Sequence, residues 1–147
     1  KLASRDSTIV SVPSRLASST SAIPASQFTA ALAGRARCLV AHPVNPPHLV
    51  PAVELCPSPE TAPETVERAK VFMAACGQSP LIMTSERKGF VMNRLQFALV
   101  REAWHLVAQG VCTPQDVDIA VRDAINAGEC DDFFVEHDVL LIGKAGL

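Results

Sequence analysis

One histidine and one carboxylate stand out in the stretch CLVAHPVNPPHLVPAVELC, residues 38–56. His42 ends an apolar run, and Glu54 lies inside the next apolar run. A carboxylate within a strand is costly unless it is paired, and imidazole exchanges protons near neutral pH. If the two runs form neighbouring strands, a hydrogen-bonded His42–Glu54 pair would make a general base. Periodicity alone leaves the alternative open, in which His42 caps its strand and Glu54 points to solvent.

Two further polar residues occupy positions where a ligand could complete their hydrogen bonds. Asn93 has aromatic neighbours one turn away on a predicted helix, and an amide on an apolar face needs partners. A structural hydrogen bond to the strand loops would satisfy it equally well. Ser21 closes the run Ser18-Ser19-Thr20-Ser21. A serine after a strand also commonly caps the next turn or helix, so both interpretations of Ser21 stay open.

Strands are needed to position these residues. Short apolar runs bounded by turn residues predict strands at residues 8–10, 16–17, 38–41, 52–56 and 80–83. His42-Pro43 is expected to end the third of these, and Asn45-Pro46-Pro47 to form an extended connection. Strands that alternate with helices up to residue 84 indicate an α/β sheet.

Three helices are predicted. The capping-box spacing of Thr61 and Glu64 begins a helix that ends near Gly77, with Val66, Ala69, Met73 and Cys76 on its apolar face. Residues 89–110 carry apolar side chains on nearly every side, so this helix is expected to be buried on most faces, with Trp104 and the phenylalanines in the core. Thr113, Pro114 and Asp116 begin a third helix. A domain boundary is expected near residues 84–89.

Composition excludes several classes of function. The 147 residues match one domain or a fragment of something larger, and 48% apolar with 19% charged residues is typical of a globular protein. A net charge of −2 without a Lys/Arg cluster argues against nucleic acid, and no apolar stretch reaches the ~18 residues that span a bilayer. The cysteines lack metal-site spacing and indicate reduced, mostly buried thiols of a cytoplasmic protein. They are Cys38, Cys56, Cys76, Cys112 and Cys130. His48, His105 and His137 are expected at the surface or in packing, and no metal site is expected.

The motifs met so far resemble the L-3-hydroxyacyl-CoA dehydrogenase family. They are Ser18–Ser21, His42-Pro-Val-Asn-Pro46, Glu54 and Gly89-Phe-Val-Met-Asn-Arg-Leu95, in the family's order and spacing. The stretches at residues 42–51 and 60–64 are most similar to its lambda-crystallin branch, the L-gulonate 3-dehydrogenases. The likeness covers about residues 16 to 126.

The resemblance implies an α/β fold, the C-terminal half of a Rossmann-type NAD-binding domain followed by the first helices of an all-α C-terminal domain. Residues 1–84 would form the former, residues 85–127 would begin the helical dimerisation domain, and residues 128–147 are a divergent tail. His42 matches the catalytic histidine and Glu54 the acid that orients it. Ser21 and Asn93 match the residues that bind the reacting oxygen. Ser19 takes a position that is asparagine in the acyl-CoA enzymes and lines the nicotinamide end of NAD. Asn45 lies in the active-site loop that follows His42, and both residues are expected to bind the cofactor.

The resemblance therefore predicts part of an NAD-dependent oxidoreductase that oxidises a small hydroxyacid, L-gulonate or a 3-hydroxyacyl-CoA, and forms a homodimer in its full-length parent. None of the seven glycines forms the G-x-G-x-x-G fingerprint that holds the NAD pyrophosphate. The isolated chain, which begins at Lys1, is therefore expected to be an inactive partial product of a longer gene. The alternative is a non-catalytic, crystallin-like protein that associates through the apolar face of the 89–110 helix.

Overall fold

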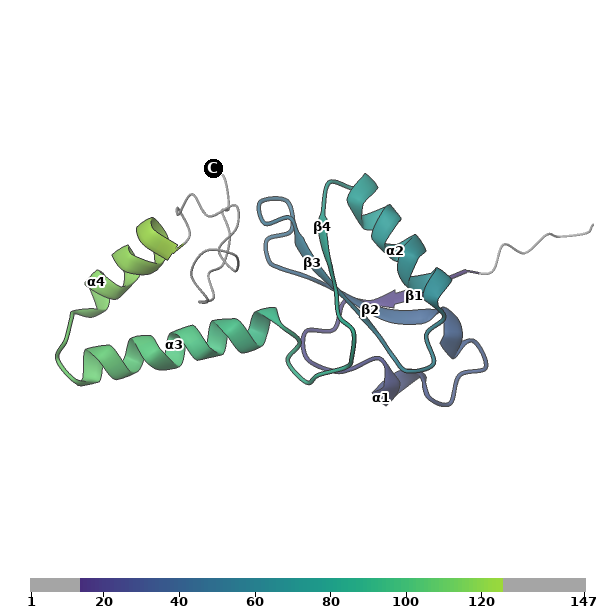
Figure 1. The fold of residues 1–147 in the computed structure, drawn as a ribbon, viewed down its shortest axis with the longest axis horizontal. Coiled ribbons are helices and arrows are strands. Elements are labelled where there is room, and N and C mark those ends of the chain that lie inside the picture. Colours follow the sequence, from purple (N-terminus) through teal and green to yellow (C-terminus); the bar gives the residue numbers. More distant parts are fainter. Residues whose placement is uncertain (1–13, 126–147) are drawn as a thin grey trace, which may run out of the picture.

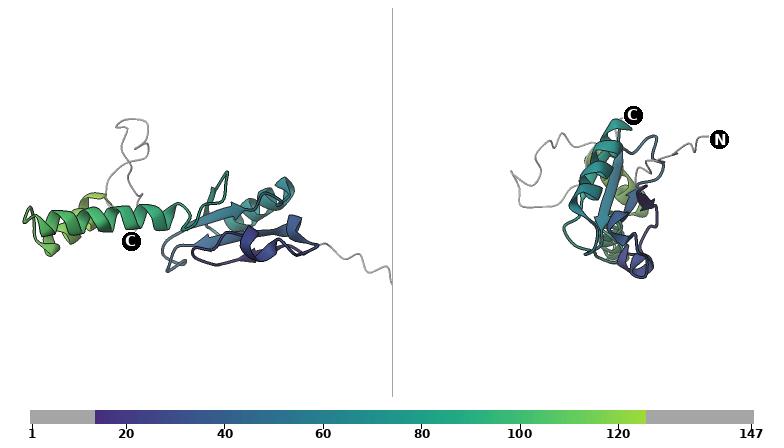
Figure 2. Two further views of the ribbon diagram at one scale, coloured as in Figure 1. Left: turned by 90° about the horizontal axis from the view of Figure 1, so that it is seen from below. Right: turned by 90° about the vertical axis from the view of Figure 1, so that its right-hand side faces the viewer.

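The computed structural model describes residues 14–125, so the predicted strand at residues 8–10, the tail at 128–147, Cys130 and His137 lie outside the described residues. A sheet with helices packed on it forms one end of the molecule, and two helices extend from it (Figure 1). The left view of Figure 2 shows the resulting elongated shape, and the right view looks along its long axis. The predicted α/β class is confirmed.

Within residues 14–125, four strands form a mixed sheet in the order β1-β2-β3-β4. They are β1 (Leu16–Ser18), β2 (Cys38–Pro43), β3 (Ala52–Pro57) and β4 (Ser79–Ile82). β1 pairs with β2 and β3 with β4 in parallel, whereas β2 and β3 are antiparallel. The strand ends at Pro43, two residues beyond the predicted last residue Ala41, because His42 and Pro43 stay in register with β3. His42 is therefore held by the sheet itself.

The connection between β2 and β3 is a turn, so the prediction of an extended segment at Asn45-Pro46-Pro47 was wrong. The amides of Leu49 and Val50 both donate to the Pro46 carbonyl at 3.0 Å. Two antiparallel neighbours need a chain reversal between them, and this requirement overrides the extended preference of the residues before proline.

The two faces of the sheet carry different cores, as expected from the period-two alternation of strand side chains. One face carries Leu39, Ala41, Val53 and Leu55, which pack with Ala69 and Met73 of α2 (Pro63–Ala75). The opposite face carries Val40 and Cys56, which pack with Ala25, Met83 and Phe90. His42 and Glu54 continue this second row along the same strands, on the face away from α2.

Two short helical segments, α1 (Ser26–Thr29) and η1 (Arg35–Arg37), precede β2. The N-cap of α2 is Ala62 rather than the predicted Thr61. Thr61 instead donates its hydroxyl to the Cys38 carbonyl at 2.7 Å and accepts the Ser58 amide at 2.8 Å. The bond from Thr61 to Cys38 links the segment before α2 to the start of β2. It is a tertiary contact that a local capping pattern does not reveal.

The two extending helices are α3 (Met92–Ala108) and α4 (Pro114–Ile119), followed by the π-helical segment η2 (Ala120–Ile125). The predicted cap of α4 is confirmed: the Asp116 amide donates to Thr113 Oγ1 at 3.2 Å, and the Thr113 amide donates to Asp116 Oδ2 at 3.0 Å. Within residues 14–125, no helix is long and apolar enough to cross a membrane.

The prediction that α3 is buried on most faces was wrong for the described residues. The side chains of Phe97 and Trp104 are each 73% exposed, whereas Phe90 is fully buried. Within residues 14–125, α3 contacts α4, and the two helices leave a groove between them. An apolar composition indicates which faces can be buried, but the covering element has to come from elsewhere in the fold.

The cysteines and histidines agree in part with the predictions. Cys38 and Cys56 are buried, Cys112 is partly buried, and Cys76 is exposed against expectation. His48 and His105 lie at the surface as predicted. Cys76 is exposed because it follows the last turn of α2, beyond the face that packs on the sheet.

The contrast between Cys56 and Cys76 gives a direct test of the sheet face that carries His42 and Glu54. Burial and the nearby Glu86 carboxylate raise the pKa of the Cys56 thiol to about 11. Only the thiolate is alkylated, so at pH 8, about three pH units below that pKa, Cys56 should react with iodoacetamide about a hundredfold more slowly than Cys76. Its rate should rise as the pH approaches 11. Peptide mapping by mass spectrometry measures both rates. In urea the two rates should converge, and equal rates in the native protein would contradict this packing.

Candidate active site

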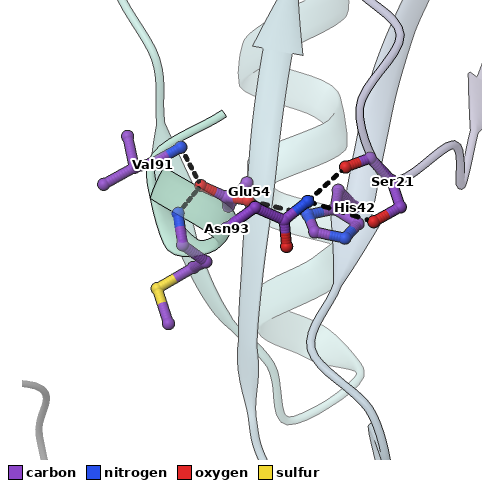
Figure 3. A network of polar contacts seen from close by, with 6 residues as sticks. Ser21, His42, Glu54, Val91 and Asn93 are labelled. Atoms are coloured by element: carbon purple, nitrogen blue, oxygen red, sulfur yellow. Dashed lines mark hydrogen bonds and ion pairs between the residues drawn. The ribbon is translucent and has the colours of Figure 1, made fainter. Parts of the chain in front are cut away.

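His42 and Glu54 form a cross-strand pair. They lie directly opposite each other in the β2–β3 register, and His42 Nδ1 is 2.7 Å from Glu54 Oε2 (Figure 3). Glu54 is 0% exposed and His42 is 7% exposed. The alternative in which Glu54 points to solvent is therefore wrong. Two residues that the sequence presents 12 positions apart meet inside the protein.

The second carboxylate oxygen of Glu54 binds the beginning of α3. Oε1 accepts the backbone amides of Val91 at 2.7 Å and Met92 at 2.8 Å (Figure 3). The first amides of a helix have no partner within the helix, and they lie at the positive end of its dipole. A buried carboxylate is tolerated only when hydrogen bonds replace its hydration. With three N–H groups around it, Glu54 has those partners.

The approach to α3 explains how its first amides reach Glu54. Gly89 and Phe90 both have left-handed backbones, with φ of 79° and 51°. This conformation suits glycine but is uncommon for a residue with a Cβ. The Phe90 ring is buried beside His42, with ring centroids 5.3 Å apart. Packing of Phe90 therefore offsets the unfavourable backbone and limits rotation of the imidazole.

The hydrogen bond at Nδ1 determines what the rest of the His42 ring can do. A carboxylate only accepts, so Nδ1 carries a proton, and in the neutral ring Nε2 keeps its lone pair. Nε2 is thus the nitrogen available to a ligand. The pair has the composition and geometry of an oriented general base.

Ser21 and Asn93 are also brought together. Asn93 Nδ2 donates to the Ser21 carbonyl and, at 3.1 Å, to Ser21 Oγ (Figure 3). Ser21 follows β1 and Asn93 lies in the first turn of α3, so the bond links the sheet to the helix. Since Oγ accepts from the amide, the hydroxyl proton of Ser21 remains free to donate to a ligand oxygen.

A cavity of about 390 Å³ joins these groups, and four of the six predicted site residues line it. They are Ser21, His42, Asn45 and Asn93. Glu54 lies behind His42 and reaches the cavity only through the imidazole. Ser19 is exposed after the end of β1 and is not part of the cavity wall.

Sequence reasoning missed two contributors to this site. The amides of Val91 and Met92 belong to the backbone, so the residue types at these positions do not predict that they bind Glu54. Gly89, at the start of the predicted 89–110 helix, was the available signal. Gln96 lines the cavity one turn after Asn93. The spacing of the two amides on one helix face would have indicated it.

Residues 4–86 match the family model of the 3-hydroxyacyl-CoA dehydrogenase NAD binding domain, and residues 89–128 match that of the 3-hydroxyacyl-CoA dehydrogenase C-terminal domain. The chain belongs to the 3-hydroxyacyl-CoA dehydrogenase family. The sequence relatives described next place the chain in the lambda-crystallin branch of this family.

Among curated relatives, the lambda-crystallin homolog of Bos taurus is 51% identical over 110 residues, which are 75% of this chain and 34% of that protein. Lambda-crystallin of Oryctolagus cuniculus is 47% identical over the same shares of the two chains. L-carnitine dehydrogenase of Streptomyces griseus is 43% identical over 108 residues, 74% of this chain and 32% of that protein. The chain thus spans about a third of the length of these relatives.

Solved structures agree on the fold. FHMPC 5-dehydrogenase, an NAD+ dependent dismutase, superposes with a TM-score of 0.71 at 36% identity, covering 77% of this chain and 37% of that one. The 3-hydroxybutyryl-CoA dehydrogenase of Escherichia coli gives a TM-score of 0.67 at 28% identity, covering 76% and 23%. The mixed sheet with its helices is therefore Rossmann-like.

The orientation of His42 can be tested by replacing Glu54 with glutamine. In Glu54→Gln the amide oxygen should stay with the Val91 and Met92 amides, so the NH₂ group would face Nδ1. Nδ1 must then accept, and the ring proton should move to Nε2. ¹⁵N NMR of the imidazole nitrogens, at a pH high enough for a neutral ring, distinguishes the two tautomers. The exposed His105, recorded in the same spectrum, is the internal control. An unchanged tautomer in Glu54→Gln would contradict the assigned role of Glu54.

Proposed function

We propose that this chain carries the proton-transfer site of an NAD-dependent dehydrogenase that oxidises a 3-hydroxy acid. The observation that carries the proposal is the 2.7 Å contact between His42 and Glu54, on a cavity whose wall also holds Ser21 and Asn93. A hydroxyl cannot become a carbonyl by losing hydride alone, because its proton has to leave as well. The cavity supplies a base for the proton and a hydroxyl donor, Ser21, for the oxygen.

Each residue has a defined part in this proposal. His42 Nε2 accepts the proton of the substrate hydroxyl. Glu54 holds the ring by its Nδ1–H and stabilises the imidazolium that forms. The Ser21 hydroxyl donates to the reacting oxygen, and Asn93 fixes that hydroxyl by donating to Oγ at 3.1 Å. NAD, when bound, accepts the hydride.

The residues of this chain fit the nicotinamide end of NAD better than its pyrophosphate. Asn45 lines the cavity, and the Ser19 hydroxyl lies near the end of β1, so both are proposed to bind toward the nicotinamide. The 147 residues contain no G-x-G-x-x-G sequence for the pyrophosphate. We therefore assign residues 1–84 to the second half of the NAD-binding domain, residues 85–127 to the beginning of the helical domain and residues 128–147 to a divergent tail. The chain is proposed to be inactive unless a segment with that fingerprint accompanies it.

The substrate is proposed to be L-gulonate or a related hydroxyacid, with a 3-hydroxyacyl-CoA as the second candidate. Relatives named lambda-crystallin, L-carnitine dehydrogenase and 3-hydroxyacyl-CoA dehydrogenase match 75%, 74% and 72% of the chain. The non-catalytic alternative is less favoured, because the proton acceptor and the oxygen-binding groups are all retained in one cavity.

The full-length protein is proposed to be a homodimer located in the cytoplasm. The exposed Phe97 and Trp104 support the dimer, and the free cysteines support the compartment.

Removal of the imidazole tests the proposed function. In the full-length product of the gene, His42→Ala should lower kcat for NAD reduction about a hundredfold or more, because the hydroxyl proton loses its acceptor. The assay follows NADH absorbance with L-gulonate and, separately, with a 3-hydroxyacyl-CoA. His48→Ala, an exposed histidine of the β2–β3 turn, is the matched control and should keep wild-type rates. A His42→Ala enzyme within a few-fold of wild type would remove His42 from the reaction.

A further inference from the structure

Gln96 is a polar group on the cavity wall that the proposed reaction does not use. It lies three residues after Asn93 on α3, and both side chains line the cavity with His42. Residues three apart occupy the same face of a helix, about 4.5 Å apart along its axis. Gln96 is therefore placed to contact the part of a substrate next to the reacting carbon.

The amide of Gln96 has its hydrogen-bonding capacity available. The Asn93 amide is engaged with Ser21, whereas none of residues 14–125 hydrogen-bonds the Gln96 side chain. A glutamine amide offers two donors and one acceptor. On the wall of a cavity, these groups are suited to a polar ligand.

Gln96 also lies where the cavity meets a second hollow. A groove of about 850 Å³ runs between α3 and α4, and its lining is mostly apolar. Three residues line both spaces: Gln96, Leu99 and Val121. Of these three side chains, only that of Gln96 can form hydrogen bonds. A substrate chain that extends from His42 toward the groove has to pass it.

We propose that Gln96 selects substrates that carry a hydroxyl group on a carbon next to the reacting one, so that a polyhydroxy acid is preferred over a 3-hydroxy acid with a plain alkyl chain. The inference deepens the proposed function and rests on it. Among residues 14–125, the side chains that line the cavity with Gln96 include no lysine or arginine, so the group that Gln96 contacts is proposed to be a neutral hydroxyl rather than a carboxylate. A site with polar groups of its own disfavours an analogue that leaves them unpaired. Because Gln96 retains contact with solvent, the preference is modest, about tenfold.

Equilibrium binding to the 147-residue chain tests this inference without any need for turnover. L-gulonate and 3-hydroxybutyrate both carry a carboxylate and a 3-hydroxyl group, and they differ in the further hydroxyls. NMR titration should give a Kd about tenfold lower for L-gulonate in the wild-type chain. Gln96→Met, which keeps the length of the side chain but removes its amide, should bring the two Kd values together. Gln115→Met, the same change at an exposed position of α4 outside both hollows, should keep the difference.

The outcomes separate this inference from the proposed function. An unchanged ratio of Kd values in Gln96→Met, or a wild-type chain that does not prefer L-gulonate, would overturn the role of Gln96. A ratio that depends on Gln96, together with a His42→Ala enzyme that still turns over, would instead refute the proposed reaction and leave the selection by Gln96 standing.

Discussion

The buried carboxylate of Glu54 is the interaction on which the site depends. One oxygen holds His42 and the other holds the first amides of α3, at distances between 2.7 and 2.8 Å. Loss of hydration makes an unpaired carboxylate in this position costly by several kcal/mol. The charge can stay buried only while β2, β3 and α3 remain together. The need to solvate one charge thus defines the mutual position of the sheet and the helix.

This constraint also fixes the rest of the cavity. Once the start of α3 is bound to Glu54, Asn93 lies in the first helical turn, where it reaches Ser21 in the loop after β1. Gln96 follows one turn later on the same wall. The left-handed backbones of Gly89 and Phe90 bring the chain into this position, and the buried Phe90 ring secures it. The proton acceptor, the oxygen-binding groups and Gln96 are therefore arranged by a single anchored helix.

Much of the sheet and part of the site could be predicted from the sequence. Short apolar runs bounded by turn residues predict the strands that carry His42 and Glu54, whereas the sequence leaves open whether Glu54 is paired or points to solvent. The backbone donors of Val91 and Met92 could not be predicted, because any residue except proline supplies the same N–H group. The exposure of Phe97 and Trp104 was also missed. The amino-acid composition of α3 shows that it has an apolar surface. Whether that surface is buried depends on which other elements pack against it.

Hydrogen exchange at the Val91 and Met92 amides tests the central role of Glu54 most directly. Wild type is compared with Glu54→Leu, and the rates are taken relative to amides in the β2–β3 ladder so that a general loss of stability cancels. If the carboxylate anchors α3, both amides are protected in wild type and exchange about tenfold faster or more, relative to the strands, in the variant. Equal relative protection in the two proteins would contradict the account.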